Sequence, residues 1–316
     1  MENSLLVTSS PHIRSKDTTS RIMLDVVIAL LPAAVSGVWF FGARTIPVIL
    51  VAVLAAVASE AIACKALGKE LTIGDFSAVV TGMLLALNLP PTIPLWIAAV
   101  GSALAIVLVK QLFGGLGQNF MNPALTARVI LLVSWPVQMT NWIIPDAVSS
   151  ATPLAMIRGK EAVEGSLPSY LDLFLGKVGG SIGETSVLAI LLGAAYLVYR
   201  RVITLEIPLT FIGTLALFTW IFGGNALFTG DYLYHMLSGG LMLSAFFMAT
   251  DYTTSPITFK GRVIMGIGCG LLTGIIRLYT NYPEGVSFAI LLMNILTPLI
   301  DRYTVPVSFG GEKKVA

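Results

Sequence analysis

Small and hydroxyl-bearing residues gather in one segment of this chain, directly before Pro153. The segment reads Ser149-Ser150-Ala151-Thr152. Its hydroxyls could hold an attached group, but these residue types are also typical of a helix N-cap with proline at the first helical position. On the local residues alone, a cap or an ordinary loop is the favoured interpretation.

Two asparagines, Asn119 and Asn122, precede a predicted helix that starts near Pro123. An amide group without a partner is costly in an apolar environment, so each side chain should be hydrogen-bonded. Capping of the helix and binding of a polar ligand would both meet this requirement. The residues leave the two alternatives open.

Acidic residues inside long apolar runs form a third candidate group: Asp25, Glu60 and Asp251. An ionisable side chain within an apolar span indicates a functional site by default. Asp25 lies near the start of its run, so Glu60 and Asp251 are the better candidates for a cation path. The hydroxyls of Thr253 and Thr254 follow Asp251 and suit a hard cation, without distinguishing Na⁺ from H⁺.

The composition shows what kind of elements must position these residues. Of 316 residues, 56% are hydrophobic and only 11% are charged, and the mean hydropathy is +0.86. A soluble domain carries roughly 25% charged residues, whereas a membrane-spanning helix needs roughly 20 apolar ones. The chain is therefore predicted to be a polytopic membrane protein, which excludes a soluble enzyme and a nucleic-acid binder. Cys64 and Cys269 lie in apolar runs and are expected to be buried, so no metal site is predicted.

Ten apolar windows predict helices, five on each side of a long mixed stretch. Short windows interrupted by Gly and Pro, at matching places in two halves, are typical of an inverted repeat. We predict an all-α fold of about ten transmembrane helices in two inverted five-helix halves, with some short or broken helices. A small-xxx-small row on the ninth window, at Gly266, Gly270 and Gly274, should pack closely against another helix. The windows are 22–41, 46–67, 76–89, 95–112, 123–135, 186–199, 203–222, 232–249, 263–278 and 286–300.

The whole chain is expected to form a single integral membrane domain, with halves at 22–135 and 186–300 and a loop at 136–185 between them. Counting Lys and Arg in alternate loops gives its orientation, because cytoplasmic loops are richer in both. The bias of 13 to 5 places segment 1–21 and tail 301–316 in the cytoplasm and the 136–185 loop outside. The 13 cations are Arg14, Lys16, Arg21, Lys65, Lys69, Lys110, Arg200, Arg201, Lys260, Arg262, Arg302, Lys313 and Lys314. The other five are Arg44, Arg158, Lys160, Lys177 and Arg277, and Arg128 lies within a span.

Residues 146–155 resemble the flavinylation motif of the RnfD/NqrB family, the membrane subunits of the ion-translocating Rnf and Nqr respiratory complexes. The family pattern is Asp-x-x-Ser-Gly-Ala-Thr followed by Pro-Leu-Ala, and Ser150 stands here where Gly is usual. Further motifs of the family follow in the same order along nearly the whole chain. The short N-terminal segment favours the RnfD branch over NqrB. The further motifs lie at 9–14, 81–82 with 89–91, 113–117, 119–124, 248–251, 282–285 and 293–301.

The resemblance implies two flavins. Thr152 would carry FMN through a phosphoester bond made by a dedicated flavin transferase, since an ester needs a hydroxyl and small neighbours give access. Asn119 and Asn122 would help to bind a non-covalent riboflavin, because amides match the mixed donors and acceptors of an isoalloxazine edge.

The function that the resemblance implies is that of an electron-transfer subunit in a Na⁺- or H⁺-translocating ferredoxin:NAD⁺ oxidoreductase, the Rnf complex. Electrons would pass across the bacterial cytoplasmic membrane between the external FMN and a riboflavin nearer the cytoplasm. Such a chain is a translocase subunit that works with other Rnf subunits and without nucleic acid, not a stand-alone enzyme. Two alternatives stay open: a channel or permease of urea-transporter type, and an NqrB-like quinone-reducing subunit.

Overall fold

The computed structural model describes residues 17–143, 152–157, 167–224, 226–280 and 285–306. Within these ranges there is no β-strand, and the regular structure is helical, which confirms the predicted all-α class. Four helices are long and apolar enough to cross a membrane: α1 (Thr19–Phe41), α2 (Thr45–Ala66), α13 (Phe259–Tyr279) and α14 (Val286–Thr304). The chain is thus a helical, polytopic membrane protein.

Shorter helices complete both halves. The first half adds α3 (Ser77–Leu87), α4 (Leu95–Leu104) continued by a π-helical segment (Ala105–Gln111), and α5 (Pro123–Ser134). The connecting stretch holds α6 (Pro136–Met139), α7 (Pro153–Ile157) and α8 (Tyr170–Leu175). The second half adds α9 (Val187–Tyr199), α10 (Glu206–Phe222), α11 (Tyr232–Leu237), α12 (Leu241–Leu243) and a second π-helical segment (Ser244–Met248).

One predicted window, 232–249, is not a continuous helix. It is divided into α11, α12 and the second π-helical segment, with the break at Ser238 and Gly239. Gly239 has a φ of +68°, a left-handed conformation that a helix cannot contain and that glycine adopts at little cost. The other nine windows each overlap with one of the helices α1 to α5, α9, α10, α13 and α14, in the predicted order.

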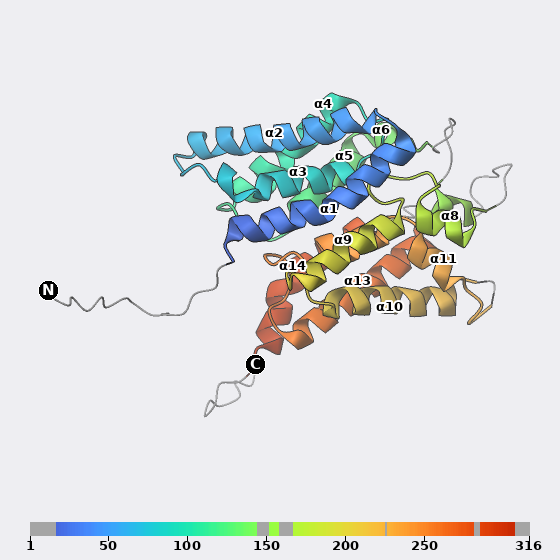
Figure 1. The fold of residues 1–316 in the computed structure, drawn as a ribbon. Helices are drawn as coiled ribbons and strands as arrows, with labels where there is room; N and C mark the ends of the chain where they lie inside the picture. Colours follow the sequence, from blue (N-terminus) through green and yellow to red (C-terminus); the bar gives the residue numbers. More distant parts are fainter. Residues whose placement is uncertain (1–16, 144–151, 158–166, 225, 281–284, 307–316) are drawn as a thin grey trace, which may run out of the picture.

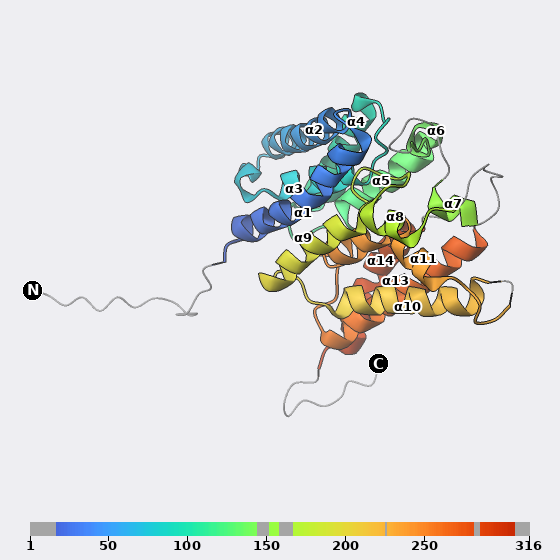
Figure 2. The ribbon, with the colours of Figure 1, turned by 45° about the vertical axis from the view of Figure 1, so that its right-hand side comes forward.

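The two halves pack into one body around a shared core. Figures 1 and 2 show the helices of the first half, in blue to green, lying along those of the second half, in yellow to red. The halves meet where α1 packs against α9 and α5 against α14. The described chain begins and ends at the same end of the bundle, while α6, α8 and α11 lie at the opposite end.

Glycine allows the close contact between α10 and α13. A Cβ atom added to Gly270 would lie 2.8 Å from the carbonyl oxygen of Phe211, and one added to Gly266 would lie 2.9 Å from that of Ile207. Gly274 faces the ring of Phe218. The predicted packing role of the three glycines is confirmed. Cys64 and Cys269 are both buried, as expected.

Candidate functional site

A cavity between the two halves unites three residues that the sequence suggested separately. Asn119, Asn122 and Asp251 all line a space of about 770 Å³, part of it open to solvent, near the beginning of α1. We call this cavity the Asn pocket. Its walls are mostly apolar, with Leu84 and Phe246 among them, so a few polar groups face an otherwise hydrophobic space. This combination is typical of a small-molecule or cofactor site.

Asn122 caps α5. Its Oδ1 accepts hydrogen bonds from the backbone N–H groups of Ala124 and Leu125, at 3.1 and 3.2 Å. Its Nδ2 also donates to the carbonyl oxygen of Met248 at 3.3 Å, which joins α5 to the second half. The capping alternative is therefore realised, and within the described part of the chain Nδ2 makes no hydrogen bond with its second N–H.

Asn119 and Asp251 are joined through a hydroxyl. Asn119 Nδ2 donates to Thr253 Oγ1 at 3.0 Å, and that hydroxyl donates to Asp251 Oδ2 at 3.1 Å. Thr254 Oγ1 donates to the same carboxylate oxygen at 3.4 Å. Thr250, which lies beside this group in the sequence, bonds instead to the carbonyl oxygen of Phe246. A single hydroxyl thus connects an amide of the proposed ligand site with an acid of the proposed cation path.

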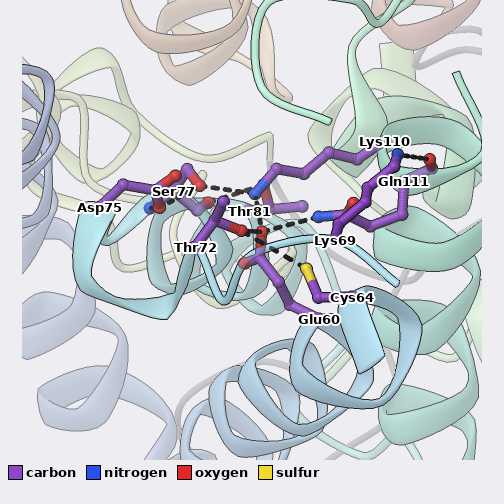
Figure 3. A network of polar contacts seen from close by, with 9 residues as sticks. All are labelled: Glu60, Cys64, Lys69, Thr72, Asp75, Ser77, Thr81, Lys110 and Gln111. Atoms are coloured by element: carbon purple, nitrogen blue, oxygen red, sulfur yellow. Dashed lines mark hydrogen bonds and ion pairs between the residues drawn. The ribbon is translucent and has the colours of Figure 1, made fainter. Parts of the chain in front are cut away.

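Glu60 lies in a separate, buried network that reaches the Asn pocket through Lys110 (Figure 3). Glu60 Oε1 accepts from Thr72 Oγ1 at 2.8 Å, Lys110 Nζ at 2.7 Å and Gln111 Nε2 at 2.9 Å. Lys110 also donates to Ser77 Oγ at 2.5 Å. Both charged residues are almost fully buried, Glu60 at 0% and Lys110 at 2% exposure. The Glu60 carboxylate forms an ion pair with the Lys110 ammonium. It is therefore not an unpaired acid.

Two cations counted as loop residues are in fact buried. Lys110 lies near the end of window 95–112 and was counted with the loop that follows, but in the structure it belongs to the π-helical segment and its side chain is buried. Arg277, near the end of α13, donates to the carbonyl oxygens of His235 and Ser238. Leaving both out keeps the charge bias, at 12 to 4.

Thr152 lines a second and smaller cavity, the Thr152 pocket, whose space of about 370 Å³ includes open solvent. Its side chain is 7% exposed, and its Oγ1 accepts from the backbone N–H of Ala155 at 3.3 Å, which caps α7. Glycines at 179, 180 and 239 border the pocket, so the backbone is open to close approach there. The motif residues Ser149, Ser150 and Ala151 lie outside the described residues. Leu173 of α8 and Leu237 of α11 line this pocket, whereas Ile22 at the start of α1 lines the Asn pocket. Helices α8 and α11 lie at the end of the bundle opposite to the start of α1 (Figures 1 and 2).

A buried polar chain occupies the region between the pockets. Arg128 on α5 lies 3.7 Å from Glu184, which lines the Thr152 pocket, and donates to the carbonyl oxygen of Asn88 at 3.2 Å. Asn88 Nδ2 in turn contacts the sulfur of Met248, whose carbonyl holds Asn122. Lys110, Arg128 and Glu184 were not selected as site residues from the sequence, although a charge inside or directly beside an apolar window was a signal for Arg128 and Glu184.

The fold defines a helical membrane protein with two cavities that polar side chains help to line. The model of the NQR2, RnfD, RnfE family matches residues 6–310, and the chain belongs to this family.

Relatives match over nearly their full lengths. The chain is 52% identical to the D subunit of the Na⁺-translocating ferredoxin:NAD⁺ oxidoreductase complex of Acetobacterium woodii, over 99% of this chain and 97% of that protein. It is 47% identical to the D subunit of the proton-translocating ferredoxin:NAD⁺ oxidoreductase complex of Clostridium ljungdahlii, over 99% and 98%. The D subunit of the ion-translocating oxidoreductase complex of Escherichia fergusonii is 37% identical, over 97% and 99%.

Proposed function

We propose that this chain is the D subunit of an ion-translocating ferredoxin:NAD⁺ oxidoreductase complex. The observation that carries the proposal is that the chain is 52% and 47% identical, over nearly its full length, to two relatives with that name. A protein of this kind works with the other subunits of its complex in a bacterial cytoplasmic membrane. The names of these relatives support neither a urea-transporter-like channel nor a quinone-reducing role.

We further propose that Thr152 carries FMN through a phosphoester, attached by a flavin transferase. The residues present fit this group. The Oγ1 of Thr185 lines the pocket and is buried without a hydrogen-bond partner in the described part of the chain, so a polar ligand group could pair with it. Capping and attachment are compatible, because Thr152 Oγ1 acts only as an acceptor in the cap and an ester oxygen keeps a lone pair.

The Asn pocket is proposed to hold riboflavin. Its apolar walls suit the faces of a flat aromatic ring, and its amides and hydroxyls suit an edge of mixed donors and acceptors. A bound flavin would supply the electron-transfer chemistry, and the protein would hold and orient the ring and exclude side reactions. Thr152 and Asn119, near opposite ends of the bundle, would then anchor two flavins for electron transfer along the length of the helices.

Replacing Thr152 tests the attachment. Thr152→Val should abolish flavin fluorescence of the denatured chain in a gel, because only a covalently held flavin survives denaturation. Thr152→Ser, which keeps the hydroxyl, is the matched control and should retain part of the signal. A fluorescent band from the valine variant would refute the assignment.

The proposed orientation places residue 166 outside and residue 117 in the cytoplasm. Cysteines introduced singly at Gly117 and Ser166 test it in intact cells with a membrane-impermeant thiol reagent. Position 166 should be labelled and position 117 should not. Labelling of both positions would contradict a route across the membrane.

A further inference from the structure

Lys110 has an unusual place for a lysine in a membrane protein. It lies at the end of the first π-helical segment, is buried, and lines the Asn pocket. Of the described residues that line this pocket, only Lys110 and Asp251 carry formal charges. A buried charge is retained only at considerable cost unless it is paired, and marks a functional site when it lies within the membrane.

The ammonium group of Lys110 is only partly used by its neighbours. A lysine has three N–H donors. One donates to Glu60 Oε1 and one to Ser77 Oγ, and in the described part of the chain no other partner of Lys110 is found. The third N–H is therefore left for an occupant of the pocket that it lines.

Glu60 balances this charge without blocking it. Three donors converge on Oε1, whereas Oε2 has no hydrogen-bond partner among the described residues (Figure 3). Asp75 accepts from Ser77 Oγ at 2.5 Å and lies behind that hydroxyl. The network thus holds the Lys110 ammonium in a fixed position, between the Glu60 carboxylate and the Ser77 hydroxyl.

We propose that Lys110 sets the reduction potential of a flavin in the Asn pocket, by placing its ammonium against the negative charge that the isoalloxazine gains on reduction. This inference rests on the proposed riboflavin site. Two electrons, supplied by the ferredoxin-to-NAD⁺ chain of the complex, and one proton from solvent leave one negative charge on the ring. Charges near the ring are among the means by which a protein tunes a flavin.

The other charges around the pocket determine the sign of each substitution. Removal of the Lys110 charge leaves Glu60 and Asp251 to disfavour a reduced ring, so the potential should fall. Removal of the Glu60 charge leaves the Lys110 ammonium without a neutralising carboxylate, so the reduction potential of the flavin should rise.

The test is a spectroelectrochemical titration of the purified complex carrying Lys110→Met or Glu60→Gln. We expect at least a tenfold change in the ratio of reduced to oxidised flavin at a fixed potential, which is about 30 mV for a two-electron couple. The change should be towards oxidised flavin in Lys110→Met and towards reduced flavin in Glu60→Gln. The double variant should lie near the wild type, and it decides the question if breaking the pair in a single variant prevents assembly.

Lys69 provides a matched control. It belongs to the same network, through a bond to the carbonyl oxygen of Gln111, but it is exposed and does not line the pocket. Lys69→Met should leave the potential unchanged, because solvent screens its charge.

Flavin released by denaturation separates the possible failures. If the wild-type complex releases riboflavin but the two single variants shift its potential in the same direction or not at all, Lys110 has only a structural role. A double variant that departs from the wild type as far as Lys110→Met also overturns the inference. If the wild-type complex releases no riboflavin, the proposed occupant of the pocket is wrong, and the role of Lys110 fails with it.

Discussion

Asn122 can be tested as a cap and as a ligand in one series of variants. Asn122→Ala removes the acceptor of two N–H groups at the start of α5 and the donor to the carbonyl oxygen of Met248. Loss of an N-cap costs about 1 kcal/mol, and leaving a buried carbonyl without its donor costs about 1–3 kcal/mol. The free energy of unfolding should therefore fall by roughly 2–4 kcal/mol.

Asn122→Ser separates these contributions. Serine keeps a capping oxygen but cannot reach Met248 with an amide, so it should recover about 1 kcal/mol relative to alanine. Thermal unfolding of the purified complex measures stability, and riboflavin released on denaturation measures occupancy of the Asn pocket. Both variants should lose riboflavin, with serine the more stable. If the serine variant keeps its full riboflavin content, Asn122 is a cap and a cross-link between the halves, and the ligand role is refuted.

Two further predictions concern packing and ion coupling. Gly270→Ala should destabilise the complex by about 1–3 kcal/mol, because the added Cβ would collide with α10. Gly213→Ala is the control: nothing lies within 4 Å of its added Cβ, so it should be neutral or slightly stabilising in the same thermal assay. Asp251→Asn should reduce Na⁺ or H⁺ transport into vesicles more than it reduces flavin content. Asp301→Asn, an acid outside the Asn pocket, should leave transport unchanged, and equal effects of the two variants would argue against Asp251 as part of the cation path.

Much of the fold could be predicted because a membrane makes helix positions visible in the sequence. Apolar runs mark α1, α2, α13 and α14 without any knowledge of their partners. The division of window 232–249 could not be predicted in the same way, because the window is largely apolar and the Gly-Gly pair at 239–240 does not by itself show that Gly239 takes a left-handed conformation. The pattern of apolar residues indicates which segments are buried, but it does not predict the backbone torsion angles of single residues.

The site was predictable in parts. Asn119, Asn122 and Asp251 could each be selected as polar residues in apolar surroundings, but Asn122 and Asp251 lie 129 positions apart and only the tertiary fold brings them to one cavity. Lys110 could not be selected, because a lysine at the end of an apolar window is typical of an interface residue. Its inward direction depends on the π-helical winding and on Glu60, 50 positions earlier in the chain.

The first π-helical segment has a consequence for how the chain tolerates changes in length. In an α-helix successive residues are about 100° apart, whereas the wider turn of a π-helix reduces this rotation. The reduced rotation allows the neighbours Lys110 and Gln111 to reach the same oxygen of Glu60. Deleting one residue between 105 and 109 would restore ordinary winding, and because about six residues of α-helix turn as far as about seven of π-helix, Lys110 would keep its direction. Rewinding the segment as an α-helix at its present length would instead turn the ammonium out of the pocket although no residue of the pocket had been changed, so the length and the winding of this segment are together part of the site.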